Sequence, residues 1–266
     1  MPKIKINDIE MYYEIHGKGE PLVLIAGFSA DHTTWSNVVT QFAKKYRVIV
    51  FDHRGAGQTS VPKDPYSIDQ LTDDVVALCY ALQIKKAHFI GNSMGGFILQ
   101  TLAYRYPHLV KSAVMSNSAC TIESVFFIYL QAQLELIKAK VPADLLLKSS
   151  CCWAFSFSFL SRPGMLDYLI QTRLNNPYPF TTTGYEGQLA ACKTFDSRTW
   201  LNKINLPVLV IGADQDLIFP ESMIHELANQ IPSAQYYGFK SCGHVPYLEY
   251  PNEFVEVALT FIEKIY

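Results

Sequence analysis

The chain has 266 residues, of which 49% are hydrophobic and 17% are charged, and its formal net charge is −2. A chain of this length and composition can bury one large core, which excludes intrinsic disorder. Its basic residues are scattered, which excludes an electrostatic footprint for nucleic acid or for an anionic membrane surface, so we expect a small-molecule ligand.

The N-terminal residues alternate between polar and apolar side chains. Residues 3–6 and 11–16 predict an antiparallel hairpin at the edge of a sheet. This segment lacks the apolar core and the cleavage site of a signal peptide, and the longest apolar stretches are far shorter than the roughly 20 residues that span a bilayer. The six cysteines form no C-x-x-C pair and are interpreted as reduced thiols. We therefore predict a cytoplasmic protein without a membrane segment.

After the hairpin, short apolar runs alternate with amphipathic stretches of helical length. The runs are apolar on both faces, which is typical of buried strands in a parallel sheet. The alternation predicts an α/β fold with a mostly parallel, eight-stranded sheet and helices on both faces. The predicted strands are residues 21–27, 46–52, 86–92, 110–116, 206–212 and 234–239. The predicted helices are residues 33–45, 67–84, 94–107, 221–231 and 252–265.

The alternation stops between residues 119 and 200, where the chain is rich in aromatic residues and proline. A connection this long must have structure of its own. We predict that residues 119–200 form an inserted, mainly helical cap over the carboxyl edge of the sheet, where open α/β sheets bind ligands. Residues 1–118 and 201–266 would then form the core.

A glycine-rich turn surrounds Ser93, between a predicted strand that ends at Ile90 and a helix that begins near Met94. So short a reversal requires a strained backbone at its tip, and Gly91 and Gly95 remove the Cβ atoms that would press strand and helix apart. The Ser93 hydroxyl would stand above the sheet beside a helix N-terminus, which favours developing negative charge. The alternative is that Ser93 only caps the helix.

The pattern G-x-S-x-G between a strand and a helix is a nucleophile elbow, and with it the chain resembles the α/β-hydrolase superfamily over essentially its whole length. The string "FDHRGAGQTS" at residues 51–60 also matches this family. We interpret that string as structural, with its glycines for turns and with Asp52 and Arg54 for bracing. The resemblance implies an α/β-hydrolase fold, a serine nucleophile with an acid and a histidine, and no cofactor.

The resemblance also selects the partners of Ser93. The family's base lies in a loop after the last strand, where His244 follows a glycine and precedes Glu249. Asp214 and Asp216 both follow a buried strand, and either carboxylate could orient the imidazole. The family's acid usually lies four residues before the proline that opens the next helix, which selects Asp216 and leaves Asp214 as the alternative.

An oxyanion formed after attack by Ser93 would need fixed donors. The resemblance assigns one to the backbone amide of Met94, after the nucleophile, and the other to Phe28, in the loop after the first central strand. Most relatives have His-Gly before that position, whereas this chain has Ala26-Gly27. Because the donor is main chain, the oxyanion hole should remain intact, although the support of the loop can differ.

The aromatic residues of the predicted cap would provide an apolar substrate pocket. Trp153 and His32 are candidate pocket residues. The alternatives are that Trp153 belongs to the cap's own core and that His32 is a loop-surface residue. We expect no metal site, since the adjacent Cys151 and Cys152 offer too few ligands.

A serine at the elbow argues against the dehalogenase and epoxide hydrolase branches, which use aspartate. Along its length the chain looks most like the 3-oxoadipate enol-lactonases and small carboxylesterases. This likeness implies hydrolysis of a small, largely apolar ester or lactone through an acyl-enzyme intermediate. The alternatives are a carbon–carbon bond hydrolase, which often shares G-N-S-M-G-G, and a ligand receptor with slow or no turnover. The sequence leaves the oligomeric state open.

Overall fold

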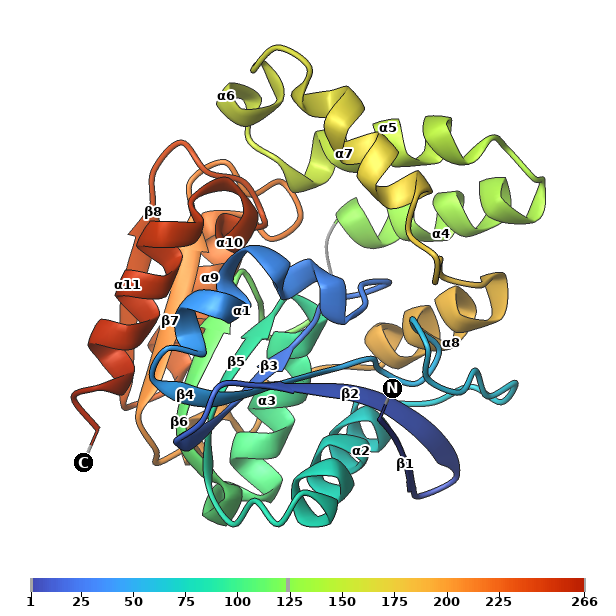
Figure 1. Cartoon of the computed structure of the whole chain (residues 1–266). Helices are drawn as coiled ribbons and strands as arrows, with labels where there is room; N and C mark the ends of the chain where they lie inside the picture. Colours follow the sequence, from blue (N-terminus) through green and yellow to red (C-terminus); the bar gives the residue numbers. More distant parts are fainter. Residues whose placement is uncertain (1, 123–124, 266) are drawn as a thin grey trace.

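The computed structural model describes residues 2–122 and 125–265. Within these ranges eight strands form one sheet in the order β1-β2-β4-β3-β5-β6-β7-β8 (Figure 1). The pairings of β1 with β2 and of β2 with β4 are antiparallel, and the other neighbours are parallel. The predicted mostly parallel, eight-stranded sheet is therefore confirmed. The strands are β1 (Lys3–Ile6), β2 (Ile9–His16), β3 (Glu20–Ile25), β4 (Tyr46–Phe51), β5 (Ala87–Asn92), β6 (Val110–Ser116), β7 (Val208–Ala213) and β8 (Ala234–Phe239).

The N-terminal hairpin is longer than predicted. β2 begins at Ile9 rather than at residue 11, because Ile6 and Ile9 pair across a two-residue turn. Asn7 takes a left-handed conformation there, with φ 45°, as tight hairpin turns require. β2 then continues past β1 to pair with β4, which joins the hairpin to the parallel part of the sheet.

Helices cover both faces of the sheet, and alternate side chains of the central strands enter two separate cores. Leu22 and Leu24 of β3 lie in one core with α1 and α11. Val23 and Ile25 lie in the other with α2, α3 and α9. Burial on both faces explains why these strands are continuous apolar runs in the sequence. The helices around the sheet are η1 (His32–Trp35), α1 (Ser36–Phe42), α2 (Ile68–Ala81), α3 (Met94–Arg105), η2 (Pro107–Leu109), η3 (Leu201–Lys203), α9 (Glu221–Gln230), α10 (Pro246–Glu249) and α11 (Pro251–Ile262).

Some helical segments differ from the prediction, including the unpredicted 3₁₀ turns η2 and η3. The expected helix over residues 33–45 starts as the 3₁₀ turn η1, whose first turn is capped because the Asp31 carboxylate accepts the Thr33 amide at 2.8 Å. The short helix α10 was not predicted, because four residues carry no helical period.

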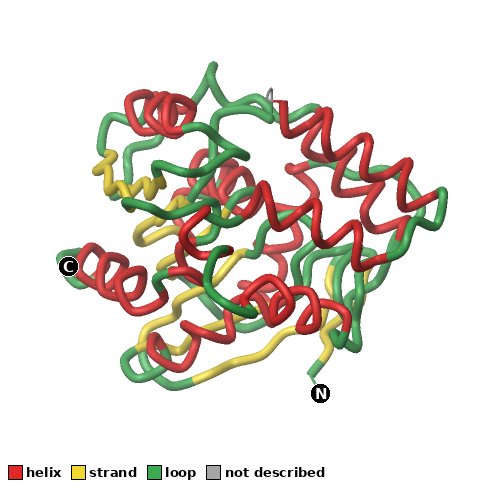
Figure 2. Tube along the Cα trace, turned by 90° about the horizontal axis from the view of Figure 1, so that it is seen from above, coloured by secondary structure: helices red, strands yellow, loops and turns green. Residues whose placement is uncertain are grey.

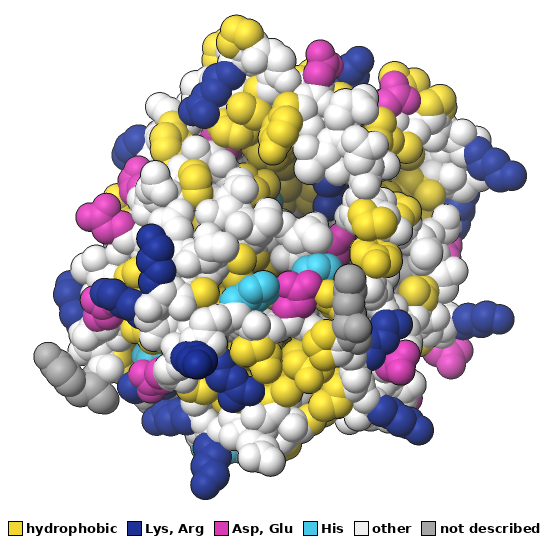
Figure 3. Space-filling view, viewed as in Figure 1, with side chains coloured by type: hydrophobic (Ala, Val, Ile, Leu, Met, Phe, Trp, Pro, Cys, Tyr) yellow, Lys and Arg dark blue, Asp and Glu magenta, His cyan; other side chains and the backbone are white. Residues whose placement is uncertain are grey.

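The segment between β6 and β7 is mainly helical, and we call its helices the lobe. They are α4 (Val125–Lys138), α5 (Ala143–Ala154), α6 (Phe157–Leu160), α7 (Met165–Leu174) and α8 (Thr182–Lys193). In Figure 1 α4, α5 and α7 lie above the sheet, and α5 packs against both α4 and α7. The view from above in Figure 2 shows helices lying next to one another on that side of the molecule. Figure 3 shows a hollow lined by hydrophobic side chains beneath these helices. None of the helices in the described ranges is long and apolar enough to cross a bilayer.

The turn between β5 and α3 leaves no room for side chains two residues before and two residues after Ser93. A Cβ atom on Gly91 would lie 2.3 Å from the carbonyl oxygen of Gly95. A Cβ atom on Gly95 would lie 2.2 Å from the carbonyl oxygen of Ile25 in β3. Both obstacles are backbone atoms of packed elements, so they cannot rotate away as a flexible side chain could.

The Gly95→Ala variant should lose about 2–3 kcal/mol of unfolding free energy, because the added methyl group forces α3 away from β3. Gly164→Ala is the matched control: its backbone φ is 74°, but a methyl group at this position would meet no atom within 4 Å. That control should lose only about 1 kcal/mol, from backbone strain alone. Equilibrium urea unfolding measures both, and equal losses would contradict the proposed crowding.

Candidate active site

Ser93 occupies the tip of the turn between β5 and α3. Its backbone angles, φ 56° and ψ −120°, have the strained conformation expected for an elbow. Its amide donates to the carbonyl of Ser116 at 3.0 Å, and its carbonyl accepts from the Gly96 amide at 2.8 Å and from the Ser118 hydroxyl at 3.0 Å. Hydrogen bonds on both sides therefore hold the strained residue in place, and its half-buried side chain stays at the carboxyl edge of the sheet.

His244 and Asp216 are joined by a hydrogen bond of 2.8 Å between Nδ1 and Oδ2. Asp216 follows β7 and His244 follows β8, and each is only 4% exposed. The other carboxylate oxygen of Asp216 accepts from the amides of Ile218 and Phe219 at 2.8 and 3.0 Å. The carboxylate is thus fixed from both sides and in turn fixes the ring, which leaves Nε2 as the nitrogen able to exchange a proton with a reacting group.

Asp214 has a different neighbour. Its Oδ1 accepts from the Cys242 amide at 3.3 Å, and this bond ties the loop after β7 to the loop after β8. The structure therefore brings Asp216, and not Asp214, into hydrogen-bond contact with His244.

Asn117, immediately after β6, was not singled out by the sequence. Its Nδ2 donates to Oδ2 of Asp216 at 3.0 Å and to the carbonyl of Gly243 at 3.4 Å. The preceding residue, Ser116, accepts the Ser93 amide. Consecutive residues at the end of β6 thus connect the Ser93 turn with the pair Asp216 and His244. The only feature of the sequence that pointed to Asn117 was its position directly after a predicted buried strand.

The Ser93 hydroxyl makes no hydrogen bond with any residue in the described ranges. The structure therefore brings Ser93 and His244 to the same sheet edge but does not join them directly. In sites without substrate, such catalytic hydrogen bonds are often long and tighten only when substrate binds.

The amides of Phe28 and Met94 are both available near Ser93. Met94 is the first residue of α3, where a helix leaves its amides without intrahelical acceptors. The Phe28 amide has no hydrogen-bond acceptor among the described residues. The adjacent Gly27 lies against the nucleophile turn, since a Cβ atom there would lie 3.2 Å from the Cβ of Ser93. Two such amides can stabilise a developing oxyanion.

The loop that carries Phe28 is supported by the loop after β4. His53 Nε2 donates to the carbonyl of Ala26 at 3.0 Å. Burial lowers the pKa of His53 and so favours the neutral ring. The sequence showed that the family's usual histidine is missing at position 26, but it did not indicate that an imidazole from the loop after β4 contacts the same loop.

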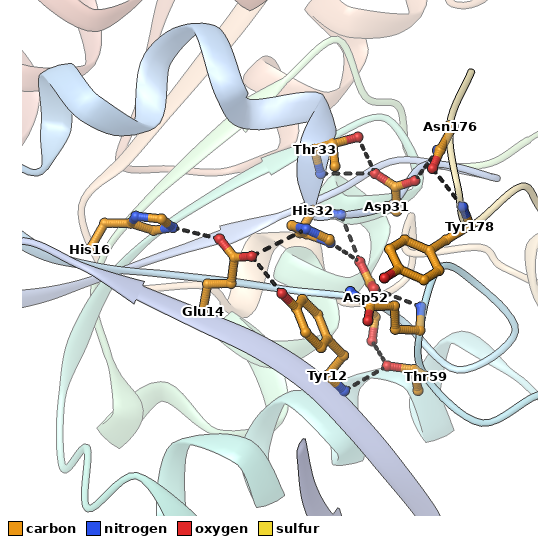
Figure 4. A network of polar contacts seen from close by, with 11 residues as sticks. Tyr12, Glu14, His16, Asp31, His32, Thr33, Asp52, Thr59, Asn176 and Tyr178 are labelled. Carbon is orange, nitrogen blue, oxygen red and sulfur yellow. Dashed lines mark hydrogen bonds and ion pairs between the residues drawn. The ribbon is translucent and has the colours of Figure 1, made fainter. Parts of the chain in front are cut away.

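His32 lies in a network of polar side chains (Figure 4). Its Nδ1 and its backbone amide both contact Oδ1 of Asp52, at 2.8 and 2.7 Å, and its Nε2 lies 3.4 Å from Glu14. Burial lowers the pKa of His32, but the hydrogen bond and charge of Asp52, with the charge of Glu14, outweigh it and raise the pKa overall. Both ring nitrogens are thus engaged by carboxylates, and a place for His32 in a substrate pocket stays a prediction.

One group in this network has a spacing that could hold a metal ion. Ligand atoms of Asp31, His32 and Asp52 lie within 4.8 Å of one another. These ligand atoms already take part in hydrogen bonds within the protein. The Asp31 carboxylate accepts from Thr33 and Asn176, and Nδ1 of His32 contacts Asp52. We therefore interpret the group as part of the structural network.

The charged residues of the "FDHRGAGQTS" string are structural but do not pair with each other. Arg54 is 1% exposed and contacts Asp74 through Nε at 2.6 Å and Asp8 through Nη2 at 2.8 Å. Asp52 instead accepts from His32 and from the Gln58 amide. The string thus braces β4 against the start of the chain and against α2.

Trp153 lies on α5 in an aromatic cluster of the lobe. Its ring centroid is 5.5 Å from that of Phe126 and 5.2 Å from that of Tyr129. The cluster packs against the larger of the two cores. These contacts join Trp153 to the lobe's own helices and to that core, and a pocket-wall role for Trp153 stays a prediction.

Glu249 connects the lobe to the loop of His244. One carboxylate oxygen accepts the amides of Gly243 and Ser156 at 3.0 and 2.9 Å, and the other accepts the Ser156 hydroxyl. The His244 amide also donates to the carbonyl of Ala154 at 2.9 Å. Glu249 is 5% exposed, and burial raises its pKa. The loop that presents His244 is therefore held from the lobe side as well as from the sheet.

Known proteins resemble this chain along nearly its whole length. A family profile described as alpha/beta hydrolase fold matches residues 20–251. The pyrrolizixenacetamide deacetylase of Xenorhabdus hominickii is 27% identical over 98% of this chain and 98% of its own length. The 3-oxoadipate enol-lactonase 2 of Acinetobacter baylyi is 32% identical over 79% of this chain and 77% of its own. The crystal structure of the enol-lactonase from Burkholderia xenovorans matches with a TM-score of 0.88 at 28% identity, covering 98% of this chain and 100% of that one.

The raised pKa of His32 predicts a pH-dependent part of the stability. A histidine whose folded pKa lies above its unfolded value stabilises the fold fully below the unfolded pKa, and this stabilisation is lost as pH rises through the folded pKa. The wild-type free energy of unfolding should therefore fall more than that of His32→Gln as pH rises from about 6.5, the ordinary histidine pKa. Urea unfolding at a series of pH values measures this, and parallel curves for the two proteins would refute it.

Proposed function

The chain belongs to the alpha/beta hydrolase fold family, and from this premise we propose that it is a serine hydrolase that cleaves a carboxylic ester or lactone through an acyl-enzyme intermediate. The observation that carries the proposal is the hydrogen bond between His244 and Asp216, at the sheet edge where the strained turn presents Ser93. An imidazole oriented by a buried carboxylate is the partner that a serine hydroxyl needs to become a nucleophile. The chain order Ser93, Asp216, His244 is the order of this fold.

In the proposed reaction the Ser93 oxygen attacks the substrate carbonyl carbon while Nε2 of His244 takes the hydroxyl proton. Asp216 stabilises the imidazolium that forms. The carbonyl oxygen becomes negative and accepts hydrogen bonds from the amides of Phe28 and Met94. His244 then gives its proton to the leaving alkoxide as the carbon–oxygen bond breaks, and in a lactone this alkoxide stays attached to the acyl group. A water molecule, deprotonated by His244, then attacks the acyl carbon. The bond to the Ser93 oxygen breaks, His244 returns the proton to that oxygen, and the acid is released.

The substrate is proposed to be small and largely apolar. The hydrophobic hollow beneath the lobe supports this, since an apolar lining favours such groups over charged ones (Figure 3). Two of the similar proteins are named enol-lactonases, which supports an ester or lactone bond as the one that is cleaved. The reaction as proposed requires no cofactor and no metal, because the nucleophile, the base and the oxyanion donors are all groups of the protein.

A ligand receptor with slow or no turnover is the second candidate. The missing hydrogen bond between the Ser93 hydroxyl and His244 favours it. The intact contact between Asp216 and His244 favours the enzyme, because a receptor without turnover has no need of an oriented imidazole.

Reaction with a fluorophosphonate probe should label wild-type protein stoichiometrically at Ser93, because the probe reacts with activated serine hydroxyls. Ser93→Ala and His244→Ala should lose the label, whereas Ser161→Ala, at an exposed serine of the lobe, should keep it. Ser93→Ala should also lower kcat for p-nitrophenyl acetate about a thousandfold or more. Intact-protein mass spectrometry measures the label. A folded wild-type protein that stays unlabelled would instead support the receptor.

The variants Asp216→Asn and Asp214→Asn test which of the two carboxylates orients His244. Asp216→Asn should lower kcat by about 100- to 10,000-fold, because the ring of His244 loses its orienting charge. Asp214→Asn should lower kcat less than about tenfold, since it alters only a loop contact. Steady-state ester hydrolysis with unfolding curves for both variants measures this, and the opposite ranking would reassign the acid to Asp214.

A further inference from the structure

Residues 27–30, which contain the proposed oxyanion donor, form a reverse turn. The Ala30 amide donates to the Gly27 carbonyl at 3.4 Å and closes the turn. Ser29, at the third position, has φ 54°, whereas Phe28 is not among the residues with positive φ. This combination is characteristic of a type II turn, in which the third position is normally glycine or asparagine. Ser29 is therefore held in a conformation that its own side chain disfavours.

Two side chains of the lobe hold the backbone of Ser29. The Ser29 amide donates to Oε1 of Gln188, on α8, at 2.7 Å. The Ser29 carbonyl accepts from Nη2 of Arg173, on α7, at 3.2 Å. Type I and type II turns differ mainly by a flip of their central peptide, and the Ser29 amide belongs to that peptide. An acceptor fixed at Gln188 thus stabilises the type II form over the type I form.

Gln188 is itself fixed. Its side chain is 1% exposed, and its Nε2 donates to the carbonyl of Arg54 at 3.4 Å. Its helix packs closely on the loop after β4, because a Cβ atom on Gly184 would lie only 1.9 Å from the carbonyl oxygen of Gly55. The Tyr66 hydroxyl bridges the same two segments through the carbonyls of Arg54 and Gly184. The acceptor therefore stands on a rigid support.

Helix α8 also contacts the side chain of the donor residue. The ring of Tyr185, one turn before Gln188, meets the Phe28 ring edge-on with centroids 4.7 Å apart. The same helix thus positions the ring of Phe28 and the peptide that follows it.

We propose that Gln188 is a positioning residue of the oxyanion hole, which holds the Phe28 amide in place by fixing the peptide that follows it and thereby the turn that contains it. This inference rests on the proposed function, in which that amide stabilises the oxyanion. Gln188 does not touch the substrate in this role. It acts through the backbone of Ser29, so its removal should weaken binding of the transition state and leave binding of the ester itself nearly unchanged.

Gln188→Met in the full chain removes the acceptor and keeps the side-chain length. We expect kcat for p-nitrophenyl acetate to fall about 10- to 100-fold with little change in KM. The fall should be smaller than for complete loss of an oxyanion donor, because the Phe28 amide is still present but less well directed. Gln133→Met is the matched control. It removes another buried amide of the lobe, one that contacts Tyr129 and Ser149 and not the turn, and should retain wild-type kcat. Should Gln188→Met fail to fold, Gln188→Asn withdraws the acceptor with a shorter amide.

The Ser29→Gly variant tests whether Gln188 acts through the turn. Glycine adopts positive φ without strain, so the turn should depend less on Gln188 in a Ser29→Gly background. The fall in kcat caused by Gln188→Met should therefore shrink at least severalfold there. The inference is overturned by an equal fall in both backgrounds, by a loss confined to KM, or by a loss no larger than that of Gln133→Met. A wild-type protein without turnover and without phosphonate labelling would instead remove the proposed function, and this inference with it.

Discussion

The strained, positive-φ backbone of Ser93 is the constraint on which the rest of the site depends. An L-residue keeps this conformation only where its surroundings compensate for the strain. Here residues 116–118, at the end of β6, supply hydrogen bonds to both backbone groups of Ser93. The middle residue of that segment, Asn117, also holds Asp216 and the carbonyl of Gly243. One short stretch of backbone thus sets the position of the candidate nucleophile relative to the candidate acid and base.

Residues of the lobe form hydrogen bonds with the core loops that carry the candidate site. Gln188 binds the turn after β3, and Ser156 binds Glu249 beside the loop after β8. These loops carry the proposed oxyanion donor and the proposed base. Since the contacts are made to backbone amides or to a buried carboxylate, each fixes a direction as well as a distance. The geometry of the reacting groups is therefore a joint property of lobe and core.

The sequence predicted those features that depend on local pattern. Apolar runs predicted the buried strands, and the spacing of Gly91, Ser93 and Gly95 predicted the strained turn. Family spacing selected Asp216, which the structure places against His244. The partners Asn117, Ser156 and Gln188 escaped prediction because each acts on residues distant in sequence, 159 positions away for Gln188 and Ser29. Such contacts arise from the packing of the lobe on the sheet, which periodicity does not encode.

The linkage between Ser156, Gly243 and Glu249 has a consequence for engineering this scaffold. A Cβ atom on Gly243 would lie 2.7 Å from the Ser156 nitrogen, so the two segments meet without space to spare. A chimaera that grafts the helical region of a homologue onto this sheet would have to reproduce both the hydroxyl and the bare glycine at that junction. The two regions are not interchangeable modules, and recombination breakpoints should be chosen to inherit them as one unit.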